Sequence, residues 1–328
     1  MTLRIVFTRE DLQRVRINDE PDPMWELIRS LHQLQERKPA PRYHEWRRQV
    51  RKRIAGQAGA RAVFGPLCTL VPRIGSFPDF LTPAPLPGDI EAGCERIAST
   101  TPDVLLPDIA AAFSGRRVLP WIRDLASGDR GTLTDLAAAL RGAYDLLLRP
   151  HWSEVRASTA GDRAARVRTL STDGLGGLLN GLPGVLGWDG EVLEVRYPAN
   201  RTLNLAGRGL TLVPSHFSWT NSITLINPEL PPVLVYRAGA STPAPTVDPL
   251  GLAALLGTSR ADCLATLVKP HSTSGLATRV GISVGSASKH AATLREAGLV
   301  LSERHGSTVI HRISPLGAAL LAGDLPGF

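Results

Sequence analysis

The 328-residue sequence has few cysteines, and this shortage excludes several kinds of site. Cys68, Cys94 and Cys263 lie far apart, and no pair has the close spacing of a metal or redox motif. An odd number of isolated cysteines indicates small core residues in a reducing cytoplasm. We therefore expect no metal and no cofactor.

The sequence also lacks any uncharged apolar segment that approaches the length of about 18 residues needed to span a membrane. Its first residues, MTLRIVFTRE, carry Arg4 and Arg9 inside the apolar run, unlike the unbroken apolar segment of a signal peptide. These features predict a cytoplasmic protein with no membrane partner.

Recognisable catalytic patterns are missing as well. No Ser–His–Asp order and no pair of carboxylates stands out, so the sequence predicts no enzymatic activity. Residues 173–190 are glycine-rich but have no preceding strand and no Lys-Ser/Thr pair. They indicate a connecting segment rather than a nucleotide-binding loop.

Positive charge is what the chain has in excess. The net charge is +7, and a basic balance favours polyanions as partners. From Pro249 onward there are seven Lys or Arg against four Asp or Glu, together with four of the eight histidines. This C-terminal part is therefore denser in positive charge than the rest.

The length fits roughly two domains, and 43% hydrophobic residues suffice for sizeable cores. The segment 237–249, RAGASTPAPTVDP, is small, proline-rich and without periodicity. It predicts a boundary, which gives an N-terminal domain over 1–240, a linker over 241–248 and a second domain over 249–328.

The N-terminal domain is predicted to be mostly helical. Residues 3–7 alternate between apolar and polar residues like a strand, and residues 65–89 are proline-rich and irregular. Thr132 or Thr134 is the expected cap of a helix over 132–148. Asp22-Pro23 predicts the start of a helix over 23–37. Further helices are predicted at 42–58, 102–113, 116–126 and 132–148, with apolar periodicity in the first and in the last two of these. After residue 188 the short runs 192–197, 202–205, 210–213, 222–226 and 233–236 predict a small sheet near 190–237.

Two further stretches in this domain have more than one interpretation. Residues 37–53, RKPAPRYHEWRRQVRKR, are favoured as a solvated helix face over a stripe of Tyr43, Trp46, Val50 and Ile54, with a second phosphate-contacting surface as the alternative. His151-Trp152 and residues 216–219 (HFSW) are favoured as core, with the lining of a small-molecule pocket as the alternative.

The C-terminal domain has the pattern of a helix-turn-helix. A helix over 259–268 stops at Pro270, and Thr273 or Ser274 caps a second helix over 274–280. Gly281 follows where a sharp turn needs positive φ, Ile282 lies beneath it, and Ser283 caps a third helix over 284–297.

Two alternating runs, 299–303 and 308–313, then flank the turn residues 304–307 and predict a hairpin, followed by a short helix over 315–321. A hairpin in this place is a wing. The predicted fold class is therefore α+β: a mostly helical N-terminal domain with a small β-sheet, followed by a C-terminal winged helix-turn-helix domain.

The stretch GISVGSASKHAATLREAGLV, residues 281–300, indicates what this domain binds. Small residues in the first half of the third helix allow a close approach to DNA, and hydroxyl and basic side chains suit phosphates and base edges. Each of these side chains also has an interpretation without DNA: His290 as a packed histidine, Lys289 as a solvated lysine, and Ser286 and Ser288 as serines that a helix tolerates. The candidate DNA-binding residues are Thr273, Ser283, Ser286, Ser288, Lys289, His290, Arg304, His305 and Arg312.

The segments LATRVGISVGSASKHAATLREAGLV and RHGSTVIHRISPLG, within about residues 255–321, resemble the ArsR-type winged-helix regulators. LRIVFTREDLQRVRI, PDPMWEL and GRGLTLVPSHFSW resemble a long N-terminal domain fused to such regulators in GC-rich bacteria. The resemblance implies a homodimeric repressor. The stretch Leu276–Val280 lacks the Cys-x-Cys box of metal-sensing members, so metal sensing is not implied.

Two other departures concern the third helix. Val284 replaces a frequent glutamine, and Ala287 and Ala291 replace bulky apolar residues. We expect a sequence-specific transcriptional regulator that represses by binding double-stranded DNA at a palindromic operator as a homodimer, with a small-molecule effector. The alternative is an interaction or scaffold protein whose winged helix docks a protein partner.

Overall fold

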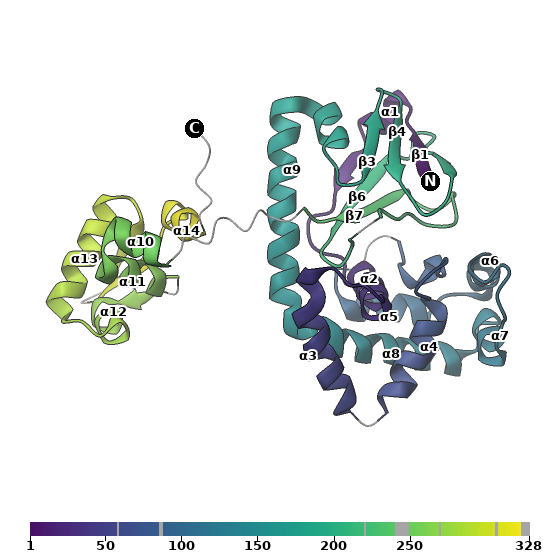
Figure 1. Ribbon diagram of the computed structural model, residues 1–328, viewed down its shortest axis with the longest axis horizontal. Coiled ribbons are helices and arrows are strands. Elements are labelled where there is room, and N and C mark those ends of the chain that lie inside the picture. Colours follow the sequence, from purple (N-terminus) through teal and green to yellow (C-terminus); the bar gives the residue numbers. More distant parts are fainter. Residues whose placement is uncertain are drawn as a thin grey trace. The chain divides into compact units, whose positions relative to one another are not determined.

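The computed structural model describes residues 1–57, 59–84, 88–219, 221–239, 249–268, 270–305 and 308–322. The chain divides into two compact units, Met1–Ala240 and Ser241–Phe328, which are drawn in Figure 1. The predicted linker 241–248 lies outside the described residues. As predicted, the fold mixes helices with small sheets.

Helix α8 (Arg130–Leu147) is the centre of the helical part of the N-terminal unit. Its buried face includes Leu136, Leu140 and Leu147, and most neighbouring helices pack against it. Around it lie α2 (Pro23–Gln35), α3 (His44–Ala55), α4 (Ala60–Leu70), α5 (Ile90–Ala98) and α7 (Pro120–Ala126), with α6 (Pro102–Ala112) packed on α7.

Two small sheets form the rest of this unit (Figure 1). The four-stranded sheet has the order β3 (Val185–Trp188), β4 (Val192–Arg196), β1 (Thr2–Val6) and β5 (Arg201–Asn204). The three-stranded sheet is parallel, with the order β2 (Val15–Ile17), β6 (Leu210–Ser215) and β7 (Val233–Arg237). The two N-terminal strands, separated by the one-turn helix α1 (Arg9–Leu12), thus complete sheets made otherwise from residues 185–237.

Helix α9 (Trp152–Asn180) is 29 residues long and packs on β3 and β6. It continues through much of the glycine-rich stretch that was predicted to be a connecting segment, with a kink at Gly174, where φ is 67°. That prediction was wrong for residues 173–180. Glycine near a helix end lowers helix propensity, but packing of the helix on a sheet can override this effect.

Three other local predictions were wrong. Residues 65–70 belong to α4, which accommodates Pro66 in its interior. The cap of α8 is Asp129, which accepts a hydrogen bond from the Thr132 amide at 2.8 Å, rather than Thr132 or Thr134. Residues 222–226 form no strand, and only Ile223 bridges to Val235.

Helix α3 carries residues 44–53 of the basic stretch 37–53, and the rest of the stretch precedes the helix. Trp46 and Val50 are buried in the helical core, and Tyr43 precedes the helix in the same core. Arg47 is itself buried and donates to the Leu34 carbonyl at 3.1 Å, whereas Lys52 is exposed. The apolar stripe is therefore core, as favoured by the sequence.

The C-terminal unit contains short helices and a three-stranded sheet of order β8-β10-β9. One core joins them, made of Leu264, Leu267, Leu276, Ala277, Leu294 and their neighbours. The elements are α10 (Pro249–Leu256), α11 (Thr258–Thr266), β8 (His271–Ser272), α12 (Thr273–Val280), α13 (Val284–Glu296), β9 (Val300–His305), β10 (Thr308–Ile313) and α14 (Pro315–Ala322).

A membrane-spanning helix would need a long apolar stretch, and none of the helices in the described ranges has one.

A buried carboxylate joins the helical part of the N-terminal unit to its parallel sheet. Glu26 on α2 is 1% exposed and accepts from the amides of His216 at 2.7 Å and Phe217 at 3.1 Å, and from Ser215 Oγ at 3.1 Å. Burial raises the pKa of Glu26 to about 7, and the three donors oppose that rise.

Further side chains fix the same loop from the helical side. Arg29 Nε donates to Ser218 Oγ at 3.0 Å, and Gln33 Nε2 donates to the Phe217 carbonyl at 3.0 Å. The Phe217 ring stacks on Tyr43 with centroids 5.6 Å apart. Residues 215–218 are therefore held by α2 through hydrogen bonds and by packing.

We predict that Glu26→Gln lowers the free energy of unfolding of the N-terminal unit by about 2–3 kcal/mol, because the amide places a donor against buried N–H groups. All six tryptophans lie before residue 240, so urea unfolding at pH 8 followed by tryptophan fluorescence reports this unit. Glu154→Gln, on an exposed position of α9, is the control and should change little. Equal stability of the two variants would contradict the role of Glu26.

Candidate nucleic-acid interface

Two serines cap the N-termini of α12 and α13, the helices that contain most of the candidate DNA-binding residues. Ser272 Oγ accepts from the Gly275 amide at 3.1 Å and starts α12, so the cap lies before the predicted Thr273 or Ser274. Ser283 Oγ accepts from the Ser286 amide at 3.1 Å and starts α13. Each hydroxyl satisfies an amide that has no partner inside its helix.

A left-handed glycine makes the turn between these helices. Gly281 has φ 75° and ψ 33°, and the amides of Gly281 and Ile282 both donate to the Ala277 carbonyl at 3.0 Å. Other residues are strained in this conformation. The turn is tight enough that Ile282, half-buried, packs on the core between the helices.

Helix α13 has one buried face and one exposed face. Ala287, Ala291 and Leu294 are at most 1% exposed and pack in the core of the unit. The small alanines therefore serve close helix packing, so the idea that they allow the approach of DNA was wrong for them. The exposed face carries Val284, Gly285, Ser288, Lys289 and Thr293.

Some of the candidate hydroxyl groups at α13 already form hydrogen bonds within the protein, and others do not. Ser283 Oγ lies 2.9 Å from Ser286 Oγ, so both take part in the cap. Ser288 and Lys289 are exposed, and their side chains make no hydrogen bond or ion pair within the described part of the chain. His290 is half-buried. Ser288 and Lys289 are therefore the polar groups most open to a ligand.

Thr273 belongs to a network at the start of α12. Its hydroxyl lies 2.9 Å from His311 Nε2, and the other ring nitrogen of His311 lies 2.8 Å from Ser302 Oγ. His311 is 5% exposed, and burial together with Arg295 lowers its pKa, so the ring is neutral at pH 7. The neutral ring ties α12 to the hairpin.

The hairpin places the remaining candidates on β9 and β10. Arg304 is exposed and lies opposite Val309 in the antiparallel register. Arg312 Nη2 donates to Glu303 Oε1 at 2.9 Å, and both side chains are about half exposed. The side chain of His305 and residues 306–307 lie outside the described residues.

Three exposed side chains here were not among the candidate DNA-binding residues. Val284 is 55% exposed at the first position of α13, and Arg279 and Arg295 are exposed in the last turns of α12 and α13. The sequence signal for Val284 is an apolar residue directly after the Ser283 cap. Arg279 and Arg295 follow the ordinary preference of basic residues for helix C-termini.

Among the residues that the structure describes, no group of three or more His, Cys, Asp or Glu is arranged to hold a metal ion. Comparisons of the chain with protein-family models, curated proteins and solved structures gave no match.

We predict opposite effects for two alanine substitutions in this region. Gly281→Ala should destabilise the C-terminal unit by about 1–2 kcal/mol, because an added Cβ meets no neighbour and only the left-handed backbone is strained. Gly285→Ala, in open space within α13, should stabilise it by about 0.5–1 kcal/mol.

Hydrogen exchange of peptides from α12 and α13 in the full chain measures both effects, since this unit contains no tryptophan. Unchanged protection in Gly281→Ala would show that the left-handed turn is not required.

Proposed function

We propose that the C-terminal unit is a winged helix-turn-helix that binds double-stranded DNA, and that the chain is a sequence-specific transcriptional regulator. The observation that carries this proposal is the order α12, left-handed Gly281, α13 and hairpin, with an exposed face of α13 that carries Lys289. The same order is typical of proteins that insert the second helix into the major groove.

In this proposal α13 is the recognition helix. Its N-terminal residues contact base edges, and its free amides and Ser288 favour phosphate oxygens. Val284 is suited to apolar contact with a thymine methyl group, and Lys289 to a phosphate or a guanine. Gly285 adds no side chain to the exposed face, so the helix backbone approaches closely.

The hairpin is the proposed wing. Arg304 near its tip is suited to the sugar-phosphate backbone or the minor groove. Arg312 is already paired with Glu303, so a phosphate contact requires it to exchange that partner. The proposed interface contains few basic groups: Lys289 on α13, Arg304 on β9 and Arg312 on β10.

We further propose that the regulator is a homodimeric repressor without catalytic activity, as the resemblance to ArsR-type proteins implies. Two copies related by a two-fold axis read a palindromic operator whose half-sites lie roughly 10 base pairs apart. The N-terminal unit then dimerises, senses a small molecule, or does both.

We predict that Lys289→Gln and Arg304→Gln each reduce the magnitude of the slope of log K against log salt by about 0.9, because each removes one phosphate contact. Fluorescence anisotropy with the DNA upstream of the chain's own coding sequence measures the slope, with scrambled DNA as competitor. Arg123→Gln, exposed on α7, is the control and should leave the slope unchanged.

Wild-type binding that resists scrambled competitor supports a sequence-specific regulator. Equal weak binding to both DNAs would contradict it and favour the docking of a protein partner. Unchanged slopes in both variants would contradict the assignment of α13 and the hairpin to the interface.

A further inference from the structure

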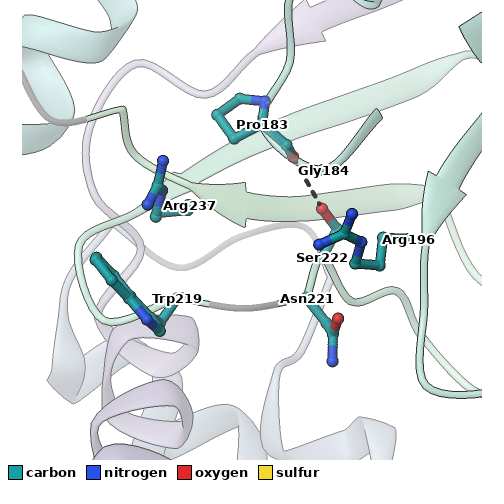
Figure 2. Close-up of a pocket in the computed structure, with 7 residues that line it drawn as sticks. All are labelled: Pro183, Gly184, Arg196, Trp219, Asn221, Ser222 and Arg237. Carbon is teal, nitrogen blue, oxygen red and sulfur yellow. Dashed lines mark hydrogen bonds between the residues drawn. The ribbon is translucent and has the colours of Figure 1, made fainter. Parts of the chain in front are cut away.

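A cavity of about 390 Å³ opens in the N-terminal unit, in the size range of small-ligand sites. Figure 2 shows side chains that line it from four separate segments of the chain. Arg196 ends β4, Arg237 ends β7, and Trp219, Asn221 and Ser222 lie in the connection between β6 and β7.

The cavity is positively charged. Among the described residues that line it, the charged ones are Arg196 and Arg237, which lie on opposite sides of it in Figure 2. Within the described part of the chain, neither guanidinium makes a hydrogen bond or an ion pair. An exposed arginine without a partner is ordinary, but two that face one cavity without a carboxylate leave their donors available to an anion.

Other arginines of the N-terminal unit, unlike Arg196 and Arg237, have hydrogen-bonded or ionic partners. Arg201 donates to the carbonyls of Leu225 and Ile226, and Arg166 pairs with Asp162 at 3.2 Å. Those side chains have structural partners that hold loops and helices in place. Among the described residues, the guanidinium groups of Arg196 and Arg237 have no hydrogen-bonded or ionic partner of this kind.

Trp219 positions one of the two arginines. The guanidinium of half-buried Arg237 lies 5.0 Å from the centre of the Trp219 ring, and that of Arg42 lies 5.8 Å from it. His216 lies next to Arg42, at 3.2 Å, and burial lowers its pKa to about 3, so it adds no charge at pH 7. Asp162 accepts from the Gly239 amide close to Arg237, but its charge is compensated by Arg166.

Polar groups without charge complete the wall. Ser222 is 2% exposed and donates weakly to the Pro183 carbonyl at 3.5 Å, and half-buried Asn221 makes no side-chain hydrogen bond within the described residues. Gly184 has φ +89°, and a Cβ there would lie 3.4 Å from Ser222 Oγ. A glycine at this position therefore keeps the wall open.

We propose that this cavity binds a small organic dianion, with one anionic group at Arg196, the other at Arg237, and neutral polar atoms at Asn221 and Ser222. The ligand class is a short dicarboxylate or a phosphate-bearing acid. As a binding site the cavity is independent of DNA; as the effector site of a regulator it rests on the proposed function.

Isothermal titration calorimetry of the full chain without DNA tests the site. The probes are succinate, glutarate and 2-phosphoglycolate, each with two anionic groups, and butyrate is the matched acid with one. We expect at least one of the three to bind in a 1:1 ratio and butyrate to bind at least about tenfold more weakly, because it leaves one guanidinium unpaired. Tighter binding of glutarate or succinate identifies a dicarboxylate site, and tighter binding of 2-phosphoglycolate a site for a phosphate-bearing acid.

Arg196→Gln and Arg237→Gln should each lower the affinity for the dianion that binds by about tenfold or more. Arg16→Gln is the matched control, since Arg16 is also an exposed strand arginine without a partner in the described chain but does not line the cavity. Unchanged far-ultraviolet circular dichroism and melting temperature verify that the variants fold.

Absence of binding by every dianion at about 10 mM, or equal binding by wild type and both cavity variants, would overturn the proposal. Neither result bears on DNA binding, which is measured separately with the C-terminal variants.

Discussion

The carboxylate of Glu26 is the interaction on which the N-terminal unit most depends. It accepts from two consecutive amides and one hydroxyl at the end of β6, where the chain leaves the parallel sheet. Without an acceptor from α2, these N–H groups would be buried and unpaired, which is costly. Because Arg29 and Gln33 hold the next residues of the same connection, α2 determines where Trp219, Asn221 and Ser222 can lie. The wall of the charged cavity thus follows from a helix that does not line it.

A different constraint shapes the C-terminal unit, where helices must cross closely and then turn sharply. Ala277, Ala287 and Ala291 provide the close packing, and Gly281 provides the turn. The outer face of α13 carries Val284, Gly285, Ser288, Lys289 and Thr293, so Lys289 is its one long donor before the last turn. In the proposed complex with DNA, such a helix would obtain specificity from shape and apolar contact as much as from hydrogen bonds to bases.

Much of the fold was predictable because its signals are local. The Asp22-Pro23 start and the stripe of Trp46 and Val50 lie on helices α2 and α3, and Gly281 with Ser283 marks the turn and the cap of α13. The end of helix α9 was predicted as a connection because Gly174, Gly176 and Gly177 lower its helix propensity, and packing on the sheet is not visible in sequence. The candidate interface could be predicted as a set of residues, but not which hydroxyls are already engaged: Thr273 reaches His311 across 38 positions of the chain. The cavity was unpredictable for the same reason, since its arginines end strands 41 residues apart in the sequence.

In the proposed regulator, Arg237 would connect the ligand to the other unit through the chain itself. Arg237 ends β7, and the following amides of Ala238 and Gly239 are fixed by the Ser215 carbonyl and by Asp162. Beyond Gly239 the chain continues to α10, so a ligand on Arg237 acts on the last strand before the proposed DNA-binding unit. A ligand changes DNA affinity only by as much as its own affinity differs between the two states of the protein. A tenfold change requires about 1.4 kcal/mol, and a single charge-assisted hydrogen bond contributes about 1.5–3 kcal/mol. In the proposed regulator, one ligand contact to Arg237 that forms in only one of the two states would therefore be enough for a tenfold change in DNA affinity.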